Sequence, residues 1–267
     1  MKFVADLHLH SKYSRAVSQD MNLETMADYA QKKGLDILST GDWTHPLWIR
    51  EIKSKLVEDS GLFKLKNGDQ KIRFLLSVEI SSIYSQGGTL RRIHNLIFVP
   101  SISSVEKINS ELFKRGANLS SDGRPIIGLS SKNLLELVLS QDQRALLIPA
   151  HAWTPWFSLY GSNSGFDSIM ECFGDYSKYI FGIETGLSSD PEMNWRIKEL
   201  DNLSILSFSD AHSPLKMGRE ATIFEISDQS SELSYDLIRE AIMNKPSSNN
   251  QELKAKIVGT IEFYPEE

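Results

Sequence analysis

The sequence predicts an α/β fold in one domain, either a (β/α) barrel or a wound sheet. Short apolar runs rich in Ile, Val, Leu and Phe recur along the chain, and amphipathic stretches of roughly 10 to 14 residues separate several of them. The chain has 267 residues, of which 40% are hydrophobic, so a sizeable core is available. An α/β barrel of about 200 to 250 residues fits this length as a single domain.

Seven regular strands are predicted, because each of these apolar runs is short and rich in β-branched or aromatic residues. They lie at residues 2–6, 35–40, 72–79, 93–99, 145–149, 180–184 and 204–208. Two less regular strands are predicted further on, at residues 221–226 and 257–263.

The clearest predicted helix lies between the first two strands. Asn22 is a capping residue, apolar residues recur at helical spacing from Leu23 to Ala30, and Gly34 follows two lysines as a stop signal. Further helices are predicted at residues 103–115, 132–139, 191–200 and 235–243.

Composition and charge exclude several classes of protein. The chain has 29 Lys and Arg against 35 Asp and Glu, a net charge of −6, which argues against non-specific coating of nucleic acid but allows a local basic groove. No apolar run approaches the roughly 20 residues that span a bilayer, and Asp6 comes too early for a signal peptide. We therefore expect a soluble, cytoplasmic protein without membrane association.

The single cysteine, Cys172, limits how a metal could be bound. One cysteine allows neither an internal disulfide nor a Cys-rich zinc ribbon within these residues. Any metal must therefore be held by His, Asp and Glu. We expect Cys172 itself to be a small buried apolar residue.

Five of the six histidines lie at or just beyond the carboxyl end of a predicted strand: His8, His10, His45, His151 and His212. Acidic residues end or follow the same apolar runs: Asp6, Asp42, Glu79, Glu184 and Asp210. The sixth histidine, His94, lies early in its strand. Barrel enzymes assemble their active sites at the carboxyl ends of their strands, so this pattern predicts a site there.

Two motifs have ligand spacing. His8 and His10 are two residues apart in an extended segment, so both imidazoles project from one face and could hold one divalent ion. Asp210 and His212 repeat this spacing with one oxygen and one nitrogen ligand. Glu79 ends a strongly apolar strand, and its two carboxylate oxygens could bridge two ions. The alternatives are exposed histidines on an edge and a salt-bridged structural Glu79.

These motifs, in this order, resemble the polymerase and histidinol phosphatase (PHP) family of metal-dependent phosphoesterases, and the resemblance covers nearly the whole chain. It implies a distorted seven-stranded (β/α) TIM-like barrel with two or three divalent ions at its carboxyl face, drawn from zinc, manganese, iron and magnesium. By resemblance, the first ion is held by His8, His10, Glu79 and Asp210. The second is held by Glu79, His94 and His151, with Glu79 bridging.

The sequence departs from the family at the third ion. Family members often carry an acid or histidine soon after the His-x-His pair and Thr-Asp-His after the second strand, whereas this chain has Ser14-Arg15 and Gly41-Asp42-Trp43. Asp42 and His212 remain as ligands. His45 either turns inward as a substitute or is a loop residue stacked before a proline.

A closer resemblance is to the endonuclease Q branch of the family. It is carried by residues 8–16 (HLHSKYSRA), 40–46 (TGDWTHP), 149–156 (PAHAWTPW), 184–190 (ETGLSSD) and 210–214 (DAHSP). The branch implies an endonuclease that nicks DNA on the 5′ side of deaminated bases such as hypoxanthine, uracil or xanthine, and at abasic sites.

Relatives in that branch usually continue into a Cys-rich zinc-binding segment and a helical carboxyl-terminal part. This sequence ends at Tyr264-Pro265-Glu266-Glu267. We therefore expect residues 1–267 to form a single PHP domain, either a short natural form or the N-terminal part of a longer protein. Its partners would be DNA and either such a segment or a DNA-repair protein.

In a phosphoesterase of this kind, a water activated by the ions would attack the phosphodiester, so no Ser or Cys nucleophile is required. We predict catalytic roles for Asp42, Asp210, His212 and Arg15, with Arg15 taking the third-ion position with its own charge. Further phosphate clamps are predicted at Lys12, Arg91, Arg92 and, more weakly, Arg219. The loop at residues 153–166 is the predicted lid, its aromatic rings either stacking on a base or packing, and Glu184 is predicted to support a ligand.

Two other functions remain open at this point. A phosphatase of the histidinol-phosphate type would release phosphate from small monoesters and leave oligonucleotides intact. A catalytically silent barrel would serve as a binding module within a larger repair protein, and it would hold no tightly bound metal.

Overall fold

The computed structural model describes residues 1–67, 71–227, 232–244 and 253–264. Its elements follow in the order β1 (Lys2–Asp6), α1 (Leu23–Lys33), β2 (Ile37–Ser39), α2 (Pro46–Lys55), β3 (Leu56–Asp59), β4 (Leu62–Leu65), β5 (Arg73–Gln86), β6 (Thr89–Val99), α3 (Ile102–Lys114), β7 (Ile126–Ile127), α4 (Ser131–Gln141), β8 (Leu146–Pro149), α5 (Ile169–Phe173), β9 (Gly182–Glu184), α6 (Pro191–Asn194), β10 (Ser204–Leu206), β11 (Ala221–Ile226), α7 (Tyr235–Met243) and β12 (Ala255–Ile261). Short 3₁₀ turns lie at Gly174–Tyr179, Lys198–Leu200 and Pro214–Lys216.

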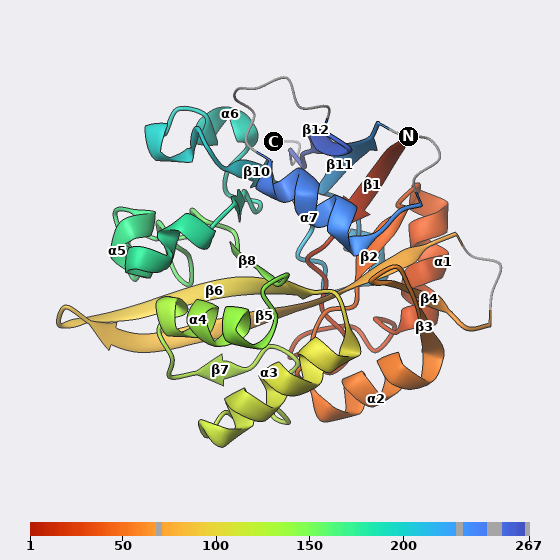
Figure 1. Ribbon diagram of the computed structural model, residues 1–267, viewed down its shortest axis with the longest axis horizontal. Helices are drawn as coiled ribbons and strands as arrows, with labels where there is room; N and C mark the ends of the chain where they lie inside the picture. Colours follow the sequence, from red (N-terminus) through yellow and green to blue (C-terminus); the bar gives the residue numbers. More distant parts are fainter. Residues whose placement is uncertain (68–70, 228–231, 245–252, 265–267) are drawn as a thin grey trace.

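Most strands belong to one mixed sheet (Figure 1). Strand β1 pairs in parallel with β2, and β2 in parallel with β5. Beyond β5 the pairing is antiparallel, first with β6 and then from β6 to β8. On the other edge, β11 and β12 add antiparallel strands to β1. The protein is therefore a mixed α/β fold rather than a regular βα repeat.

The closed barrel expected from the sequence is not confirmed. Within the described residues, strand pairing runs from β12 to β8 and stops, and β9 and β10 pair only with each other. Hydrogen bonds link β8 to β9 and β10 to β11 where no pairing between the described strands does. The Ala152 N–H donates to the Glu184 carbonyl at 2.9 Å, and the Ser207 N–H donates to Thr222 Oγ1 at 3.0 Å.

The sheet nevertheless curls around a common interior. Buried apolar side chains from β1, β2, β5, β6, β8, β10 and β11 form one cluster, in which Leu75, Phe98 and Phe208 are fully buried. Helix α7 contributes to the same cluster through Ile238 and Ile242. Neighbouring residues of the strands point the other way and pack under the helices. Because side chains alternate along a strand, this arrangement needs apolar residues on both faces.

Helices cover the outside of this sheet. In Figure 1, α2 and α3 lie below the β5–β6 hairpin, α4 lies in front of it and α7 lies above it. Helix α1 begins and ends as predicted: the Asn22 side chain accepts a hydrogen bond from the Thr25 N–H, and Gly34 ends the helix with φ of 73°. Helices α3, α4 and α7 lie within two residues of their predicted bounds.

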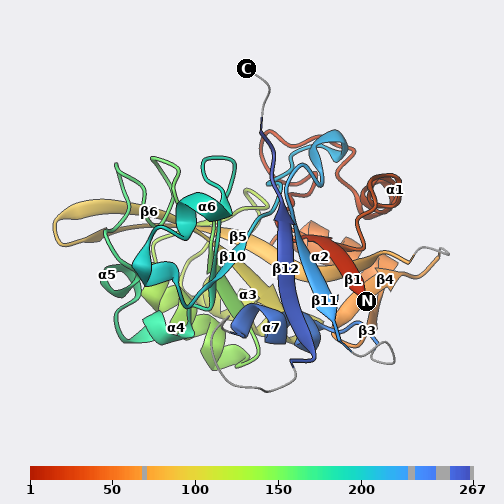
Figure 2. The same ribbon diagram turned by 90° about the horizontal axis from the view of Figure 1, so that it is seen from above.

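The strongest departure from the predicted elements is the length of β5 and β6. Together they form a hairpin that extends as an arm from the body of the protein (Figure 2) and turns at Gly87 and Gly88, both with positive φ. This register places His94 opposite Ser81, two residues beyond Glu79. His94 in the middle of β6 thus comes beside Glu79 in the middle of β5, and Glu79 does not end its strand as predicted, because the hairpin continues to Gln86.

The predicted helix at residues 191–200 is largely wrong. Only Pro191–Asn194 is α-helical, followed after a break by the 3₁₀ turn Lys198–Leu200. The side chain of Asn194 donates to the carbonyl of Asp190 and to Ser189 Oγ, and accepts from Trp153 Nε1. Such side-chain hydrogen bonds compete with the helix.

Helix α2 was not predicted, although its signals were present. Pro46 occupies its first turn, a position that suits proline, and the His45 side chain accepts from the Leu47 N–H as a cap. Among the described residues, no helix combines the length and the apolar character that crossing a membrane requires.

Candidate metal centre

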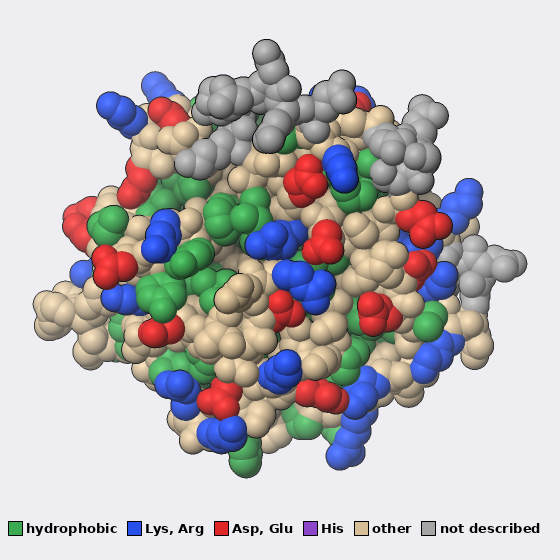
Figure 3. All heavy atoms as spheres, viewed as in Figure 1, with side chains coloured by type: hydrophobic (Ala, Val, Ile, Leu, Met, Phe, Trp, Pro, Cys, Tyr) green, Lys and Arg blue, Asp and Glu red, His purple; other side chains and the backbone are tan. Residues whose placement is uncertain are grey.

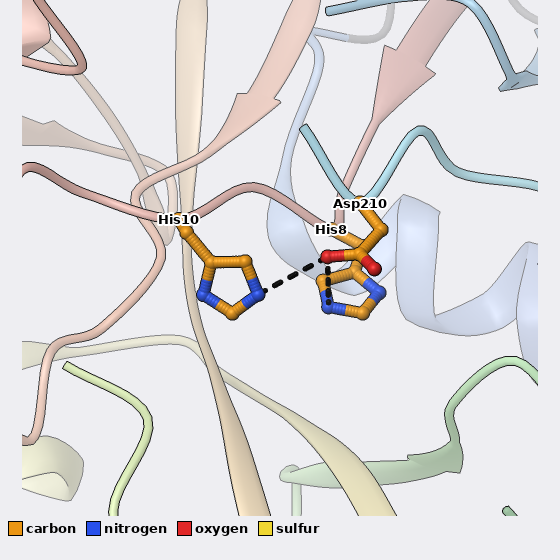
Figure 4. A group of neighbouring side chains, drawn as sticks. All are labelled: His8, His10 and Asp210. Carbon is orange, nitrogen blue, oxygen red and sulfur yellow. Dashed lines mark ion pairs between the residues drawn. The ribbon is translucent and has the colours of Figure 1, made fainter. Parts of the chain in front are cut away.

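Three predicted ligand atoms meet where β1 ends and the loop after β10 begins (Figure 4). His8 Nε2 lies 3.6 Å and His10 Nε2 lies 3.2 Å from Asp210 Oδ1. The two imidazoles are almost fully buried. A backbone bridge between Leu9 and Ala211 holds the two segments together, so the His-x-His and Asp-x-His motifs face each other. We call these residues the first ligand group.

A second ligand group is built on β5, β6 and the loop after β8. His94 Nδ1 lies 2.6 Å and His151 Nε2 lies 3.1 Å from Glu79 Oε1, and the two imidazole nitrogens are 3.2 Å apart. In each group, the ligand atoms all lie within 4.8 Å of one another.

Glu79 joins the two groups. Its Oε1 faces His94 and His151 and lies 3.8 Å from His8 Nε2, while its Oε2 lies 3.4 Å from His10 Nε2. Burial alone would raise the pKa of Glu79, but the neighbouring imidazoles hold it well below its usual range. The side chain is therefore an anionic bridge between two sets of nitrogen and oxygen ligands.

The residues fit divalent cations. His8 Nε2, His10 Nε2 and Asp210 Oδ1 are buried, and within the described part of the structure none has a hydrogen-bond partner. Buried polar atoms without partners are costly and rare, and here three of them converge on one point. Imidazole nitrogens with carboxylate oxygens suit zinc, manganese and iron.

Carboxylates behind the first group fix how its imidazoles face. Glu184 accepts from His8 Nδ1 at 2.8 and 3.1 Å, which is the support predicted for it, and it also accepts from the His151 N–H at 2.7 Å. Asp42 accepts from His10 Nδ1 at 3.1 Å. With Nδ1–H donated outward, Nε2 of each ring faces the centre, the usual arrangement behind ligating histidines.

The predicted catalytic residue Asp42 is fully buried, and it serves the protein's own hydrogen bonds. Besides His10, it accepts from the Ser11 N–H at 2.6 Å, Ser11 Oγ at 2.7 Å and Ser14 Oγ at 2.9 Å. The carboxylate thus has a full set of donors and lies behind His10, outside both ligand groups.

Backbone strain is concentrated at the site. Asp42, His151 and Asp210 have φ values of 49°, 29° and 47°, a region that residues with a Cβ rarely adopt. Gly186 permits the His151 conformation, because a Cβ on Gly186 would lie 2.4 Å from the Cβ of His151. Such strain persists only where surrounding contacts enforce it.

The predicted third-ion residues are not brought together. The His45 ring stacks on Tyr13 with 4.6 Å between centroids and caps α2, the loop-residue alternative. The Arg15 side chain is 78% exposed and pairs with Asp122 at 3.5 Å, outside both ligand groups. His212 stays at the rim: its ring lies 4.8 Å from that of His10, and its Nδ1 lies 2.9 Å from the Asp210 carbonyl oxygen.

The predicted phosphate clamps Arg91 and Arg92 hold the loop at residues 153–166. The Arg91 guanidinium donates to the Gly165 carbonyl and lies over the Phe166 ring, and that of Arg92 lies over Trp156. Backbone hydrogen bonds from β6 add to these contacts. The predicted lid at residues 153–166 is therefore held against β6 by these contacts. Lys12, another predicted clamp, forms an ion pair with Glu51.

Arg124 is the functional candidate that the sequence analysis missed. Its Nη1 lies 3.1 Å from Glu79 Oε2, and its side chain is 29% exposed, so the guanidinium lies between the centre and solvent. The Ser81 N–H donates to the Pro125 carbonyl and the Gly123 N–H to the Tyr13 carbonyl, which anchors this loop on both sides. No local motif marks Arg124, since only long-range contacts bring residues 118–125 to β5.

Electrostatics couple the two groups. Burial alone would lower the pKa of His8 and His10, but carboxylates raise both well above the usual value, led by Glu184 for His8 and Asp42 for His10. Burial lowers the pKa of His94 to about 4, so this imidazole is neutral and suited to ligation at neutral pH. A cation among these atoms would replace the protons on His8 and His10, so its binding should release protons.

The remaining predicted residues have structural roles. Cys172 is buried and free, and burial raises the pKa of its thiol to about 12, as expected of a packed apolar residue. Asp6 is fully buried and accepts from Ser209 and from the Gly218 N–H, which ties β1 to the loop that carries Asp210. Arg219 donates to the Ser209 carbonyl in the same loop.

The protein thus has a mixed α/β fold and a centre of histidines and acids that the Glu79 carboxylate joins. Comparison with known proteins identifies sequences and structures similar to this chain. No family model matches the chain. An uncharacterized protein of Methanocaldococcus jannaschii, MJ0043, is 36% identical over 166 residues, which are 62% of this chain and 18% of that protein.

Two solved structures are similar over nearly the whole chain. The lesion-specific endonuclease Q of Pyrococcus furiosus has a TM-score of 0.81 and 33% identity over 97% of this chain. Endonuclease Q in complex with a duplex substrate that has an abasic lesion at the active site has a TM-score of 0.78 and 35% identity over 91% of this chain. The chain spans 58% and 56% of those two proteins.

Proposed function

We propose that this chain is a metal-dependent phosphoesterase of the PHP type that hydrolyses DNA phosphodiester bonds on the 5′ side of deaminated bases or abasic sites. The observation that carries the proposal is the pair of ligand groups joined by Glu79, with buried, unpartnered atoms of His8, His10 and Asp210 at their meeting point. The similarity to endonuclease Q, at 33 to 35% identity, supports DNA as the substrate.

Two divalent ions would be held by the two ligand groups. His8, His10, Asp210 and Glu79 would hold the first, and Glu79, His94 and His151 the second. When bound, such ions supply Lewis acidity and lower the pKa of water, which is the chemistry that phosphodiester cleavage needs. Zinc, manganese and iron match these donors, and magnesium matches the carboxylates.

The protein's own residues would orient and neutralise the phosphodiester. Arg124 lies beside Glu79 with part of its guanidinium open to solvent, where it can bind a non-bridging phosphate oxygen. His212 can donate its Nδ1 proton to the Asp210 carbonyl, which leaves Nε2 free to exchange a proton with a leaving oxygen. We assign phosphate binding to Arg124 in place of Arg15, which lies outside the ligand groups.

The test is a nicking assay on labelled duplexes that contain hypoxanthine, uracil or an abasic site, against an undamaged duplex, each with magnesium, manganese or zinc. We expect cleavage of the damaged strands and its loss in Glu79→Gln, with activity retained in the exposed-site control Glu58→Gln. Release of phosphate from small monoesters without nicking of any duplex would contradict the proposal and favour a small-molecule phosphatase.

A further inference from the structure

A line of stacked side chains leads from the second ligand group to the surface. The ring of His94 lies 4.7 Å from that of Phe157, centroid to centroid. The guanidinium carbon of Arg92 lies 5.7 Å from the centroid of the Phe157 ring and 5.0 Å from that of the Trp156 ring. Exposure rises along the line, from 7% at His94 to 48% at Trp156.

The backbone around Trp156 is fastened to the strand that carries His94. The His94 N–H donates to the Phe157 carbonyl at 3.0 Å, and Thr154 Oγ1 donates to the Trp156 carbonyl at 2.9 Å. Phe157 has a φ of 62°, a strained conformation that these contacts maintain. The indole is thus presented at a fixed place beside the centre, so little conformational entropy is lost when a ligand covers it.

The exposed part of this line has the chemistry of a stacking site. Arg92 lies over one face of the Trp156 indole, and the side chain still has 48% of its surface exposed, which leaves area for a second flat ring. Nucleobases of any identity stack on such rings, and a guanidinium beside the ring attracts the adjoining phosphates. Trp195 is also exposed, at 65%, but within the described part of the chain no ring or cation contact links it to a ligand group.

We propose that Trp156 and Arg92 form a stacking subsite for one unpaired nucleobase next to the phosphodiester held at the centre. The proposal rests on the proposed function in one respect, namely that the substrate is DNA. The added contact lies beside the second ligand group and detects whether a base is present, but it does not distinguish one base from another.

The experiment measures binding without turnover. A short single-stranded thymidine oligonucleotide and its base-free counterpart, made with tetrahydrofuran abasic units, are titrated with the chain in EDTA at fixed pH and salt. We expect Trp156→Ala to weaken binding of the thymidine strand by about 5- to 100-fold and to leave binding of the base-free strand unchanged. Trp156→Phe should retain most of the affinity, and Trp195→Ala should retain all of it.

Equal loss on both strands would overturn the subsite, because it would assign Trp156 a structural or purely electrostatic role. No loss on either strand would overturn it as well. Trp156→Phe keeps the ring and so guards against a folding defect in the alanine variant. Because no cleavage is measured, failure of the nicking assay contradicts the proposed function alone, while the ratio of the two affinities decides the subsite.

Discussion

The orientation of each imidazole in the first ligand group is set one hydrogen bond behind the ligand atom. His8 has Glu184 behind it, and His10 has Asp42. Both acids are fully buried, so each contacts only other groups of the protein. The chemistry of the centre therefore depends on residues that would not touch a bound ion.

Replacing Glu184 tests this dependence. In Glu184→Gln the charged acceptor behind His8 and behind the His151 N–H becomes a neutral amide, so we expect metal affinity to fall by about 10- to 100-fold. Competition with a chromogenic zinc chelator measures the affinity. The exposed acid Glu192 provides the control in Glu192→Gln, and equal affinities in the two variants would contradict the assignment.

Glu220 is expected to make the stability of the protein depend on pH, separately from the metal centre. Its side chain is 1% exposed, its Oε2 has no partner within the described residues, and burial, followed by the carboxylates of Glu262 and Glu184, raises its pKa to about 8. A raised pKa means that the folded protein binds the proton more tightly. This contribution to stability is complete below the ordinary glutamate pKa and is lost as the pH rises through about 8.

We therefore expect Glu220→Gln to gain stability relative to the parent protein as the pH rises from 6 to 9, by on the order of 2 kcal/mol. The amide carries no charge and has no such titration. Chemical denaturation at each pH measures the difference. A difference in unfolding free energy that stays constant over this range would show that Glu220 does not titrate as inferred.

At the scale of elements, the site depends on two loops packed against each other rather than on one motif. Gly186 follows β9, and its α-carbon faces His151, which follows β8. The only pairing of β9 within the described strands is with β10, so this contact carries part of the connection between β8 and β9.

Alanine substitutions at two glycines with nearly equal φ distinguish the cost of backbone strain from the cost of losing this contact. Gly186 has φ of 62° and Gly87 has φ of 61°, but a Cβ at Gly87 meets nothing within 4 Å. We expect Gly87→Ala to cost about 1 kcal/mol through strain alone, and Gly186→Ala to cost about 3 kcal/mol or more and to displace His151. Thermal unfolding and zinc titration measure the two effects, and equal behaviour of the variants would contradict the packing argument.

The molecule as a whole combines an acidic chain with a centre suited to anions once cations are bound. The net charge is −6, and on the face shown in Figure 3 basic and acidic side chains are interspersed and no histidine is visible. Glu79 and Asp210 are among the acids counted in that charge. Two divalent ions would neutralise these ligands and reverse the local field, so an acidic protein can still receive a phosphate backbone.

Metal binding should therefore stabilise the folded protein. At an ion concentration about 100 times the dissociation constant, one site contributes about 2.7 kcal/mol, which raises the melting temperature by about 5 to 10 °C. We expect this rise when zinc or manganese is added to EDTA-treated protein, and its reduction in Asp210→Asn. Differential scanning calorimetry measures it, and an unchanged melting temperature in the parent protein would count against the ligand groups.

The sequence by itself determined most of the strands, most of the helices and the ligand types, because these depend on local spacing. An i, i+2 pair at a strand end puts His8 and His10 on one side wherever the strand lies. The family resemblance already grouped His94 with Glu79, whereas only the tertiary structure decided that Arg124 rather than Arg15 lies beside the centre and that the strands curl without a closed ladder. These features depend on register and on loop packing between distant segments, and no short stretch of sequence records either.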